Sequence, residues 1–514
     1  MMPITATLLA HTLRVLTGLE PGPSADEVEI EPTDVRYIEA TWSETVVRGR
    51  PWVPHKRLAT VSDGTRLVVR GIVQSRDDKG CHGKPWYAIY PFGFVCSEQA
   101  RESERGPEPG AAMPLAEGRR VPFSYAYVRT DGVPMYAGYA DVDAGVPTRP
   151  LTKGMSLVVA RTLEYDGADW IQTEDGALVP KAGIRFGGQG SEWSGVELTG
   201  TYAGPSFAWT KLKKGTPVRS APATSAERVL ELELRTRVPL LERSEASSQR
   251  SFWRVGEDLW IDADHLNEVH IAAAPPPEVL DDWRGRNTGN DQWIDVDLGE
   301  QVLVGYRGDR AVFATMVSSG RSMPTPRGNY PVWAKVASTT MASQAYEDKP
   351  YMVQGVPWVI LFQGHNALHG AYWHDKFGTP KSHGCVNLAP HDARYVFEWT
   401  GPTLPLGWTG YLPSDLRRAV VVHVRDSSRG GFVQDRPIGP PDREAEKARA
   451  EAADERRALS EYDSTPQYDP AFVPGGVVVD PSEVSAELPD PGETPSGPRL
   501  EPRTSPGIGA GLPG

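Results

Sequence analysis

Residues 368–387 read LHGAYWHDKFGTPKSHGCVN and contain Cys385, one of only three cysteines in the chain. Five of the 11 histidines fall between His365 and His391. A free thiol has a pKa of about 8.5, so a cysteine nucleophile needs a nearby base, and imidazole can serve as that base. Gly384 directly precedes Cys385 and lets the chain turn there without a Cβ clash. This stretch therefore predicts a nucleophilic thiol on a tight turn, surrounded by histidines.

A helix is expected soon after the cysteine. Pro390 suits the first helical turn, and the residues that follow have the i, i+3, i+4, i+7 spacing of one helix face. That face is formed by Ala393, Val396, Phe397 and Thr400. The helix dipole would favour a thiolate, but its effect fades beyond about one turn, so its contribution at Cys385 is minor.

The order of the reactive residues gives the clearest indication of a family. Residues 382–387 (SHGCVN), with His369 and Gly370 upstream, resemble the signature of L,D-transpeptidases of the YkuD type, envelope enzymes that remodel peptidoglycan. The resemblance extends over roughly residues 290–425. It includes residues 295–298 (DVDL) with Gln301, the pair Ser319 and Gly320, and residues 325–330 (TPRGNY). It implies a mainly β catalytic domain with a mixed sheet, one or two helices and a capped cleft.

The resemblance assigns a role to most residues of the signature. Cys385 would be the nucleophile, which attacks the carbonyl of an L-centred diamino residue in a tetrapeptide stem and expels the terminal D-Ala. His369 would be the general base and then the acid for the leaving amine, and the carbonyl of Gly370 would orient its imidazole. Backbone N–H groups of Cys385 and of Gly384 or His383 would form the oxyanion hole.

The signature leaves the acyl acceptor open. Substrate contacts on the acceptor side are expected from Ser382, Asn387 and Trp373. At the position of Asn387 many members of the family carry Arg and others carry Asn. The thioester is resolved by the amine of a second stem, by an amine of an envelope protein, or by water. The acceptor decides between an L,D-transpeptidase and an L,D-carboxypeptidase or endopeptidase. A cell-wall binding protein with a degenerate enzyme domain is a third alternative. No metal or organic cofactor is expected.

A zinc site is another interpretation of this cluster. Its four ligands would be His365, His369, His383 and Cys385, since a His-x-x-x-His pair can present two ligands on one helix. However, residues 359–362 (VILF) are typical of a strand, and glycines flank the pair, so a helix is not expected there. The sequence therefore favours the nucleophile.

Other residues near the signature have no assigned chemistry. Positions at the surface or behind the site are expected for His365, His374 and His391. Tyr372 and Trp373 fit the core as well as a substrate contact. Solvation is expected for Lys335 and Arg321.

The region before the catalytic segment is predicted to be all β. From about residue 60 to residue 273, short β-branched runs alternate with Gly, Asp and Pro turns. A loose repeat places Trp86, Trp170 and Trp260 at spacings of 84 and 90 residues, which indicates separate small barrels and not a solenoid. Residues 154–183 and 215–265 weakly resemble bacterial SH3-like domains. Plain β packing without a ligand is equally open.

The predicted domain boundaries follow these changes of composition. They are an N-terminal segment at 1–59, a first SH3-like β module at 60–150, a second at 151–200, a third at 201–273, a linker at 274–290, the catalytic domain at 291–425 and a tail at 426–514. The tail is rich in Pro, Gly and acidic residues. It is expected to be disordered, with one solvated helix within residues 441–462.

Charge and hydropathy exclude two classes of protein. The chain of 514 residues has 54 Lys and Arg against 67 Asp and Glu, a net charge of −13, and no basic stretch that would favour a nucleic acid partner. No run of about 18 apolar residues is present, so a membrane-spanning protein is not expected.

The cysteines indicate an oxidising compartment. Cys81 and Cys96 lie 15 positions apart and could form a bridge, which would leave Cys385 as the free thiol. Residues 4–19 (ITATLLAHTLRVLTGL) are moderately apolar, but His11 and Arg14 interrupt them, so a signal peptide is only one of two alternatives. A periplasmic or secreted envelope enzyme that acts on peptidoglycan stem peptides is the resulting prediction.

Overall fold

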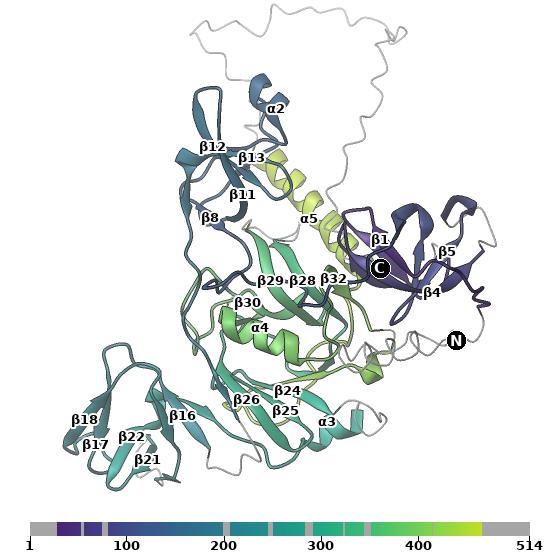
Figure 1. The fold of residues 1–514 in the computed structure, drawn as a ribbon. Helices are drawn as coiled ribbons and strands as arrows, with labels where there is room; N and C mark the ends of the chain where they lie inside the picture. Colours follow the sequence, from purple (N-terminus) through teal and green to yellow (C-terminus); the bar gives the residue numbers. More distant parts are fainter. Residues whose placement is uncertain are drawn as a thin grey trace, which may run out of the picture. The chain divides into compact units, whose positions relative to one another are not determined.

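The computed structural model describes residues 28–52, 56–74, 81–198, 206–244, 250–282, 291–321, 324–343, 351–413 and 415–464. This part of the chain is mainly β, as predicted (Figure 1). Residues 4–19, with their signal-peptide alternative, and the predicted disordered tail beyond residue 464 lie outside it. The chain divides into two compact units, and among the described elements only α5 (Arg443–Ser464) belongs to the second. This helix confirms the one expected within residues 441–462.

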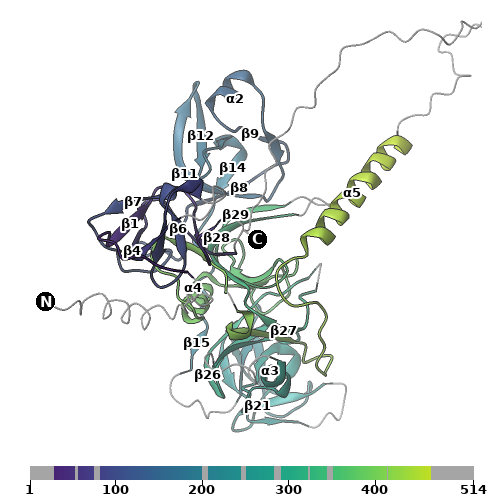
Figure 2. The same ribbon diagram turned by 90° about the vertical axis from the view of Figure 1, so that its right-hand side faces the viewer.

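The first group of strands lies at residues 37–103 and is called module 1. Its strands are β1 (Tyr37–Ala40), β2 (Thr45–Arg48), β3 (Arg57–Val61), β4 (Arg66–Val73), β5 (Trp86–Ile89), β6 (Phe94–Cys96) and β7 (Ala100–Ser103). β1 pairs with β4 and β7, β5 joins β4 to β6, and β2 joins β6 to β3 (Figure 2). A disulfide joins Cys81 to Cys96 within this module.

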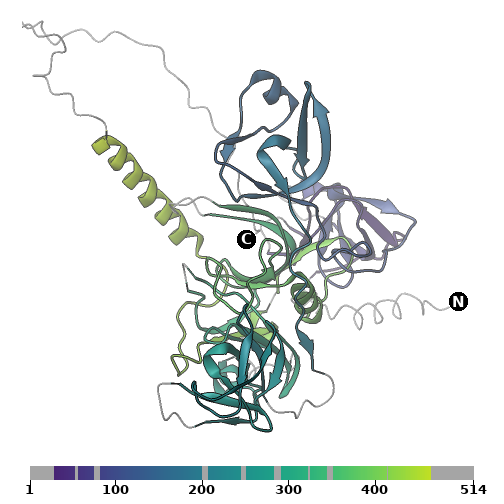
Figure 3. The same ribbon diagram turned by 90° about the vertical axis from the view of Figure 1, so that its left-hand side faces the viewer.

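Two further groups follow, called module 2 (residues 125–186) and module 3 (residues 207–269). Module 2 contains β8 (Tyr125–Val128), β9 (Val133–Met135), α2 (Tyr139–Ala144), β10 (Arg149–Leu151), β11 (Ser156–Tyr165), β12 (Ala168–Thr173), β13 (Leu178–Pro180) and β14 (Ile184–Phe186). Module 3 contains β16 (Phe207–Thr210), β17 (Thr216–Arg219), β18 (Arg228–Leu232), β19 (Arg237–Pro239), β20 (Glu242–Arg243), β21 (Phe252–Gly256), β22 (Leu259–Asp262) and β23 (Leu266–Val269). Each has its own apolar core. The strands of module 3 form a separate group at the lower left of Figure 1, and the blue strands of module 2 lie at the top of Figure 3.

Strand pairing divides the chain differently from the predicted boundaries at residues 60 and 150. β1 and β2 precede residue 60, yet β1 pairs with β4 and β2 with β6, two strands of module 1 that follow it. β8 precedes residue 150, yet it pairs with β11 and β14 of module 2. Composition marks strands and turns but does not show which strands pair, and this explains the difference. The resemblance of the modules to SH3-like domains stays a prediction.

The part of the chain that was predicted to be the catalytic domain contains two sheets that share one apolar core. One sheet has the order β15 (Val196–Glu197), β26 (Arg310–Met316), β25 (Val302–Arg307), β24 (Gln292–Asp297), β33 (Val421–Arg425) and β27 (Gly328–Pro331). The other contains β28 (Ala334–Ala342), β29 (Met352–Gln363), β30 (Asn366–Gly370), β31 (Val386–Leu388) and β32 (Trp408–Tyr411). The helices are α3 (Pro277–Asp282), within the predicted linker, and α4 (Pro390–Trp399). One core contains Val296 of the first sheet, Leu368 of the second and Phe397 of α4.

The helix predicted from Pro390 is confirmed by α4. Pro390 stands at its first turn, and Ala393, Val396 and Phe397 are buried on the predicted face. α4 begins two residues after β31 ends. It thereby covers the strands that carry the signature.

Lys335 was predicted to be solvated, and this is wrong. Its side chain is fully buried, and its Nζ donates to the carbonyls of Phe397, Thr400 and Pro402. Burial lowers the pKa of Lys335 to about 7, with Glu398 opposing the shift. The last carbonyls of a helix have no partner within the helix, so they can replace water as acceptors for a buried ammonium group. Arg321 is exposed, as predicted.

The start of the predicted disordered tail is ordered against the catalytic region. Residues 426–439, called the C-terminal strap, follow β33 directly. Asp435 pairs with Arg327, and the Asn329 N–H donates to Gln434 Oε1 at 2.9 Å. At its far end, the Gly364 N–H donates to the carbonyl of Gly439 at 2.9 Å. Disorder was predicted from residue 426 onward, and for residues 426–439 this is wrong. Their partners lie 75 to 108 positions upstream, where local composition gives no sign of them.

Candidate active site

Cys385 lies on the tight turn that leads into β31. Gly384 has a φ of +141°, a conformation that suits glycine because it has no Cβ. The Cys385 side chain is half-buried, and its Sγ lies 3.7 Å from the carbonyl oxygen of His365. His365 is exposed in the turn between β29 and β30, so the thiol faces the end of that hairpin.

Two hydroxyl groups hold the cysteine turn. Ser382 Oγ accepts from the Gly384 N–H at 3.1 Å and donates to the carbonyl of Cys385. Thr325 Oγ1 donates to the carbonyl of Gly384 at 2.7 Å and accepts from the Gly320 N–H at 2.9 Å. The hydroxyl groups of Ser382 and Thr325 therefore fix the backbone at Gly384 and Cys385.

A second layer behind the turn contains residues that belong to the family signature. The carbonyl of Ser319 accepts from the N–H groups of Lys381 and Ser382. Ser319 itself is bonded to Gln301, whose side-chain amide donates to Ser319 Oγ at 2.6 Å and accepts from the Ser319 N–H at 2.8 Å. The structure thus brings Gln301, Ser319 and Thr325 to one place, directly behind Cys385.

His369 lies on β30 and is 2% exposed. β30 and β31 are parallel, with His369 opposite Asn387. Leu368, Val386 and Leu388 belong to the core between the sheets. Because side chains alternate along a strand, His369 and Asn387 lie on the other side of this strand pair, and Cys385 directly precedes β31.

Local contacts fix the imidazole of His369. Its Nδ1 lies 3.3 Å from the carbonyl oxygen of Gly370, and its ring stacks on Trp373 with the ring centres 5.7 Å apart. An Nδ1–H that donates to this carbonyl leaves the lone pair on Nε2. Burial lowers the pKa of His369 to about 4, which the Gly370 carbonyl opposes. Burial also raises the pKa of the Cys385 thiol to about 11.

Asn387 and His374 form a polar pair beside this site. The Asn387 side-chain amide contacts His374 Nε2 at 2.9 Å, and the Asn387 backbone forms two hydrogen bonds with Ser318. Burial lowers the pKa of His374 to about 4. His374 was expected at the surface or behind the site, and the second placement is the one observed. The contact between His374 and Asn387 had no separate signal in the sequence. The same is true of the hydrogen bonds that the Thr325 hydroxyl makes at the cysteine turn.

The other histidines of residues 365–391 have no contact with the pair of Asn387 and His374 among the hydrogen bonds of the described residues. His383 is exposed and stacks on Tyr351, with the ring centres 4.8 Å apart. His391 on α4 contacts Ser194 and Asp392. His365 and His369 lie on a hairpin and not on a helix. Across the described ranges, no group of three or more His, Cys, Asp or Glu residues is placed to hold a metal ion.

Comparison with known families identifies this region. Residues 291–421 match the YkuD family, described as the L,D-transpeptidase catalytic domain. The chain contains a YkuD domain. In the part of the chain covered by the structure, no helix is both long and apolar enough to cross a membrane.

Known proteins similar to the YkuD domain are L,D-transpeptidases by name. YciB of Bacillus subtilis (strain 168), named as a candidate L,D-transpeptidase, is 26% identical over 122 residues, which cover 21% of this chain and 59% of YciB. The catalytic domain of an Enterococcus faecium L,D-transpeptidase is 23% identical and covers 27% of this chain and 100% of its own, with a TM-score of 0.22. An L,D-transpeptidase of Mycobacterium smegmatis is 19% identical and covers 35% of this chain and 80% of its own, with a TM-score of 0.22. This chain spans about three fifths of the curated relative.

Proposed function

We propose that the chain is an extracytoplasmic L,D-transpeptidase that transfers the acyl group of a peptidoglycan tetrapeptide stem through Cys385. The observation that supports this is that His369 lies on β30 and that Cys385 directly precedes β31, the strand paired with β30, within the matched YkuD domain. The disulfide between Cys81 and Cys96 supports an oxidising compartment, where such bonds persist.

The proposed reaction has two steps. In the first, Cys385 Sγ bonds to the stem carbonyl carbon, its proton passes to His369 Nε2, and the bond to the terminal D-Ala breaks as His369 returns that proton to the leaving amine. In the second, the amine of another stem or of an envelope protein attacks the thioester. His369 takes the amine proton and returns it to the departing sulfur.

The protonation states favour proton transfer during the attack. With the pKa of the Cys385 thiol near 11 and that of His369 near 4, both groups are neutral at pH 7. Neutral His369 can accept the thiol proton, and the proposed attack therefore does not need a preformed thiolate. A low-dielectric pocket disfavours separated charges before the substrate binds.

The turn also indicates where the oxyanion binds. The Gly384 N–H already donates to Ser382 Oγ, so we assign the oxyanion hole to the N–H groups of Cys385 and His383. Trp373, half-buried against His369, is proposed to contact the substrate. Ser382 and Asn387 are only 8% and 2% exposed, so we propose that they hold the turn and His374 and do not bind the substrate.

The nucleophile is tested by covalent capture. Incubation with a carbapenem is expected to add one inhibitor mass to the peptide that contains Cys385, and the Cys385→Ala variant should remain unmodified. Intact-protein and peptide mass spectrometry measure both. No adduct on the wild type, together with no turnover of any stem peptide, would leave a cell-wall binding protein as the better description.

The acceptor is tested by product analysis. Purified tetrapeptide stems are expected to give cross-linked dimers together with released D-Ala. D-Ala without dimers at any stem concentration would identify an L,D-carboxypeptidase that uses the same thioester.

A further inference from the structure

The segment between the two proposed catalytic residues is contacted by the N-terminal modules. Residues 371–381, called the connecting loop, join β30 with His369 to the cysteine turn. Side chains from modules 2 and 3, and from residues 187–195 between them, bond to this loop at three places. The proposed function has no use for these contacts.

Module 2 binds the start of the loop at Tyr372, which is 3% exposed. The ring of Tyr125 stacks on Tyr372 with the ring centres 3.5 Å apart and the planes 17° apart. The Tyr372 hydroxyl donates to the carbonyl of Gln354 at 2.6 Å and is hydrogen-bonded to Ser156 of β11. Tyr127 donates to the carbonyl of Tyr372 at 3.4 Å. The main chain and the ring of Tyr372 are both held by module 2.

Tyr372 in turn contacts the aromatic group beside His369. The rings of Tyr372 and Trp373 meet edge to face at 4.9 Å, and Trp373 stacks on His369 at 5.7 Å. A continuous series of ring contacts therefore runs from Tyr125 to His369. A shift of Tyr372 would change the position of Trp373 and with it the packing of the imidazole.

Module 3 binds the middle of the loop at Asp375. Arg235, in the turn between β18 and β19, places Nη2 2.7 Å from Asp375 Oδ1 and donates to the carbonyl of Asp375 at 3.1 Å. Ser191 Oγ donates to the same carboxylate, and the Arg235 guanidinium stacks 5.3 Å from the ring centre of Trp193. Burial raises the pKa of Asp375, but the hydrogen bonds from Arg235 and Ser191 outweigh it and lower the pKa overall.

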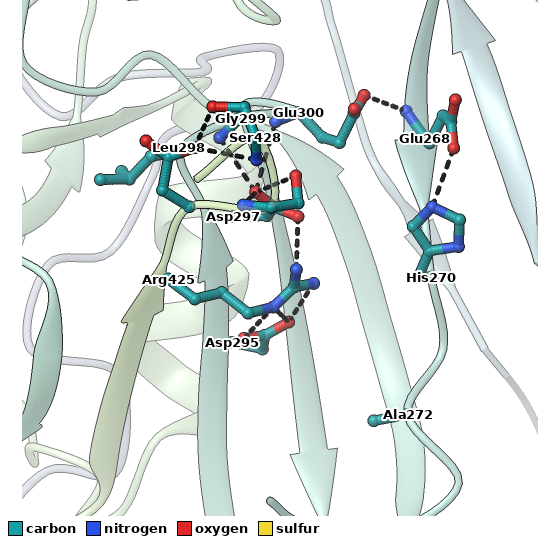
Figure 4. Close-up of polar contacts among 12 residues, drawn as sticks. Glu268, His270, Ala272, Asp295, Asp297, Leu298, Gly299, Glu300, Arg425 and Ser428 are labelled. Atoms are coloured by element: carbon teal, nitrogen blue, oxygen red, sulfur yellow. Dashed lines mark hydrogen bonds and ion pairs between the residues drawn. The ribbon is translucent and has the colours of Figure 1, made fainter. Parts of the chain in front are cut away.

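Module 3 also binds the loop at Gly378. Asn267 of β23 donates from Nδ2 to the carbonyl of Gly378 at 3.1 Å and to that of Glu300 at 2.7 Å. Next to it, the Glu268 N–H donates to the carboxylate of Glu300 at 2.8 Å, and Figure 4 shows Glu300 reaching across to β23. Gly378 has a φ of +90°, and a Cβ there would lie 2.7 Å from Asn267 Oδ1. The close approach of β23 therefore depends on glycine.

We propose that modules 2 and 3 position the connecting loop for the acylation of Cys385, with Tyr125 and Arg235 as positioning residues. This inference rests on the proposed function. Reactive groups need their geometry set to within about 1 Å, since misplacement of that size can cost about 100-fold in rate. Loss of a contact at Tyr372 or Asp375 frees the loop that carries Trp373. This loss changes the packing of His369, although neither contact involves the substrate.

The test compares the full-length chain with Arg235→Gln, Asp375→Asn and the double variant. The carbapenem acylation rate of Cys385 is expected to fall about three- to tenfold in each. The double variant should be no slower than the slower single variant, because the two substitutions break the same contact between Arg235 and Asp375. Alkylation of Cys385 by iodoacetamide, which needs no aligned base, should stay within about twofold. The control is Arg254→Gln, which breaks the pair of Arg254 with Glu242 in the same module and should leave both rates unchanged.

Hydrogen exchange of the connecting loop provides a readout that does not depend on activity. Faster exchange in residues 371–381 of Arg235→Gln, at an unchanged melting temperature, together with slower acylation, supports the proposal. Unchanged exchange overturns it, and so does faster exchange with an unchanged acylation rate. A wild type that no carbapenem acylates contradicts the proposed function instead, while the exchange data still decide whether the modules hold the loop. Tyr125→Leu repeats the comparison for module 2.

Discussion

At the cysteine turn, the hydrogen bonds described above come from the YkuD domain itself, through Ser319 and Thr325. At the connecting loop, Gln354 and Asn387 of the same domain also contribute, but further hydrogen bonds come from residues far upstream, including Tyr127, Arg235 and Asn267. Both segments flank the same pair of proposed catalytic groups. The proposed nucleophile is thus held by its own domain, whereas the surroundings of the proposed base are also contacted by modules that lie outside the matched region.

This difference separates what the domain supplies from what this chain adds. In the proposed function, the chemistry takes place at the cysteine turn. The connecting loop can be supported in other ways, and here modules 2 and 3 support it. We therefore expect substitutions at the turn to affect chemistry strongly and substitutions at the module contacts to affect it in smaller, graded steps.

The largest effect is expected for His369→Gln. Loss of the base should slow the acylation of Cys385 by a carbapenem about 1000-fold, the middle of the range for general base catalysis. Stopped-flow or quenched mass spectrometry measures the rate. His391→Gln, at an exposed histidine of α4, is the matched control and should react as the wild type does. A loss of less than tenfold in His369→Gln would assign the base to another residue.

A smaller loss is expected for Thr325→Val, which has nearly the same shape. The hydroxyl joins the Gly320 N–H to the carbonyl of Gly384, and its removal leaves both groups without this partner. Acylation should slow about 100-fold if the turn shifts by the order of 1 Å. Thr379→Val, at an exposed hydroxyl bonded to Lys376 in the connecting loop, should change the rate less than twofold. Equal effects of the two variants would remove the contrast between turn and loop.

Tyr372→Phe tests the loop and should have a still smaller effect. The variant keeps the ring stack on Tyr125 but loses the hydroxyl that donates to the carbonyl of Gln354. The same hydroxyl is hydrogen-bonded to Ser156, and a cost of about 1 kcal/mol at the reacting groups from the loss of both bonds predicts acylation about fivefold slower. Tyr165→Phe, which removes an exposed hydroxyl bonded to Asp143 in module 2, serves as control. A 100-fold loss would show that the loop matters as much as the turn.

The smallest change is expected in the dependence of the acylation rate on pH. Neutral His369 is the active form, so the rate should fall as the pH drops through about 4. The thiol stays protonated until the pH approaches 11, so the rate should vary little between about pH 5 and pH 9. A tenfold rise between about pH 6 and pH 8 would indicate a thiolate that forms before the attack.

The cysteine half of the site was predictable because its signal is local. Cys385, Gly384 and Ser382 are adjacent in the sequence, and the helix from Pro390 follows from its spacing. Gln301, Ser319 and Thr325 were found only through the family resemblance. Their roles at the turn come from contacts across 18 to 63 positions, which the sequence alone does not show.

The contacts of modules 2 and 3 with the connecting loop were not predictable, for a physical reason. Tyr127 and Tyr372 are 245 positions apart, and Arg235 and Asp375 are 140 apart, so no periodicity links them. Lys335 shows the same limitation, because its carbonyl partners at the end of α4 lie 62 to 67 positions away. Single-sequence patterns report local structure, whereas these contacts depend on how modules pack.

The hydrogen bond from Gly364 to Gly439 has a consequence for truncation of the tail. The turn that presents the His365 carbonyl to Cys385 is bonded to a residue 18 positions beyond the end of the matched domain. Proteolysis after residue 439 would leave this bond intact. A cut between residues 425 and 439 would remove it while every residue of the signature is still present. Such a trimmed form would still match the family and yet have a loosened turn beside Cys385.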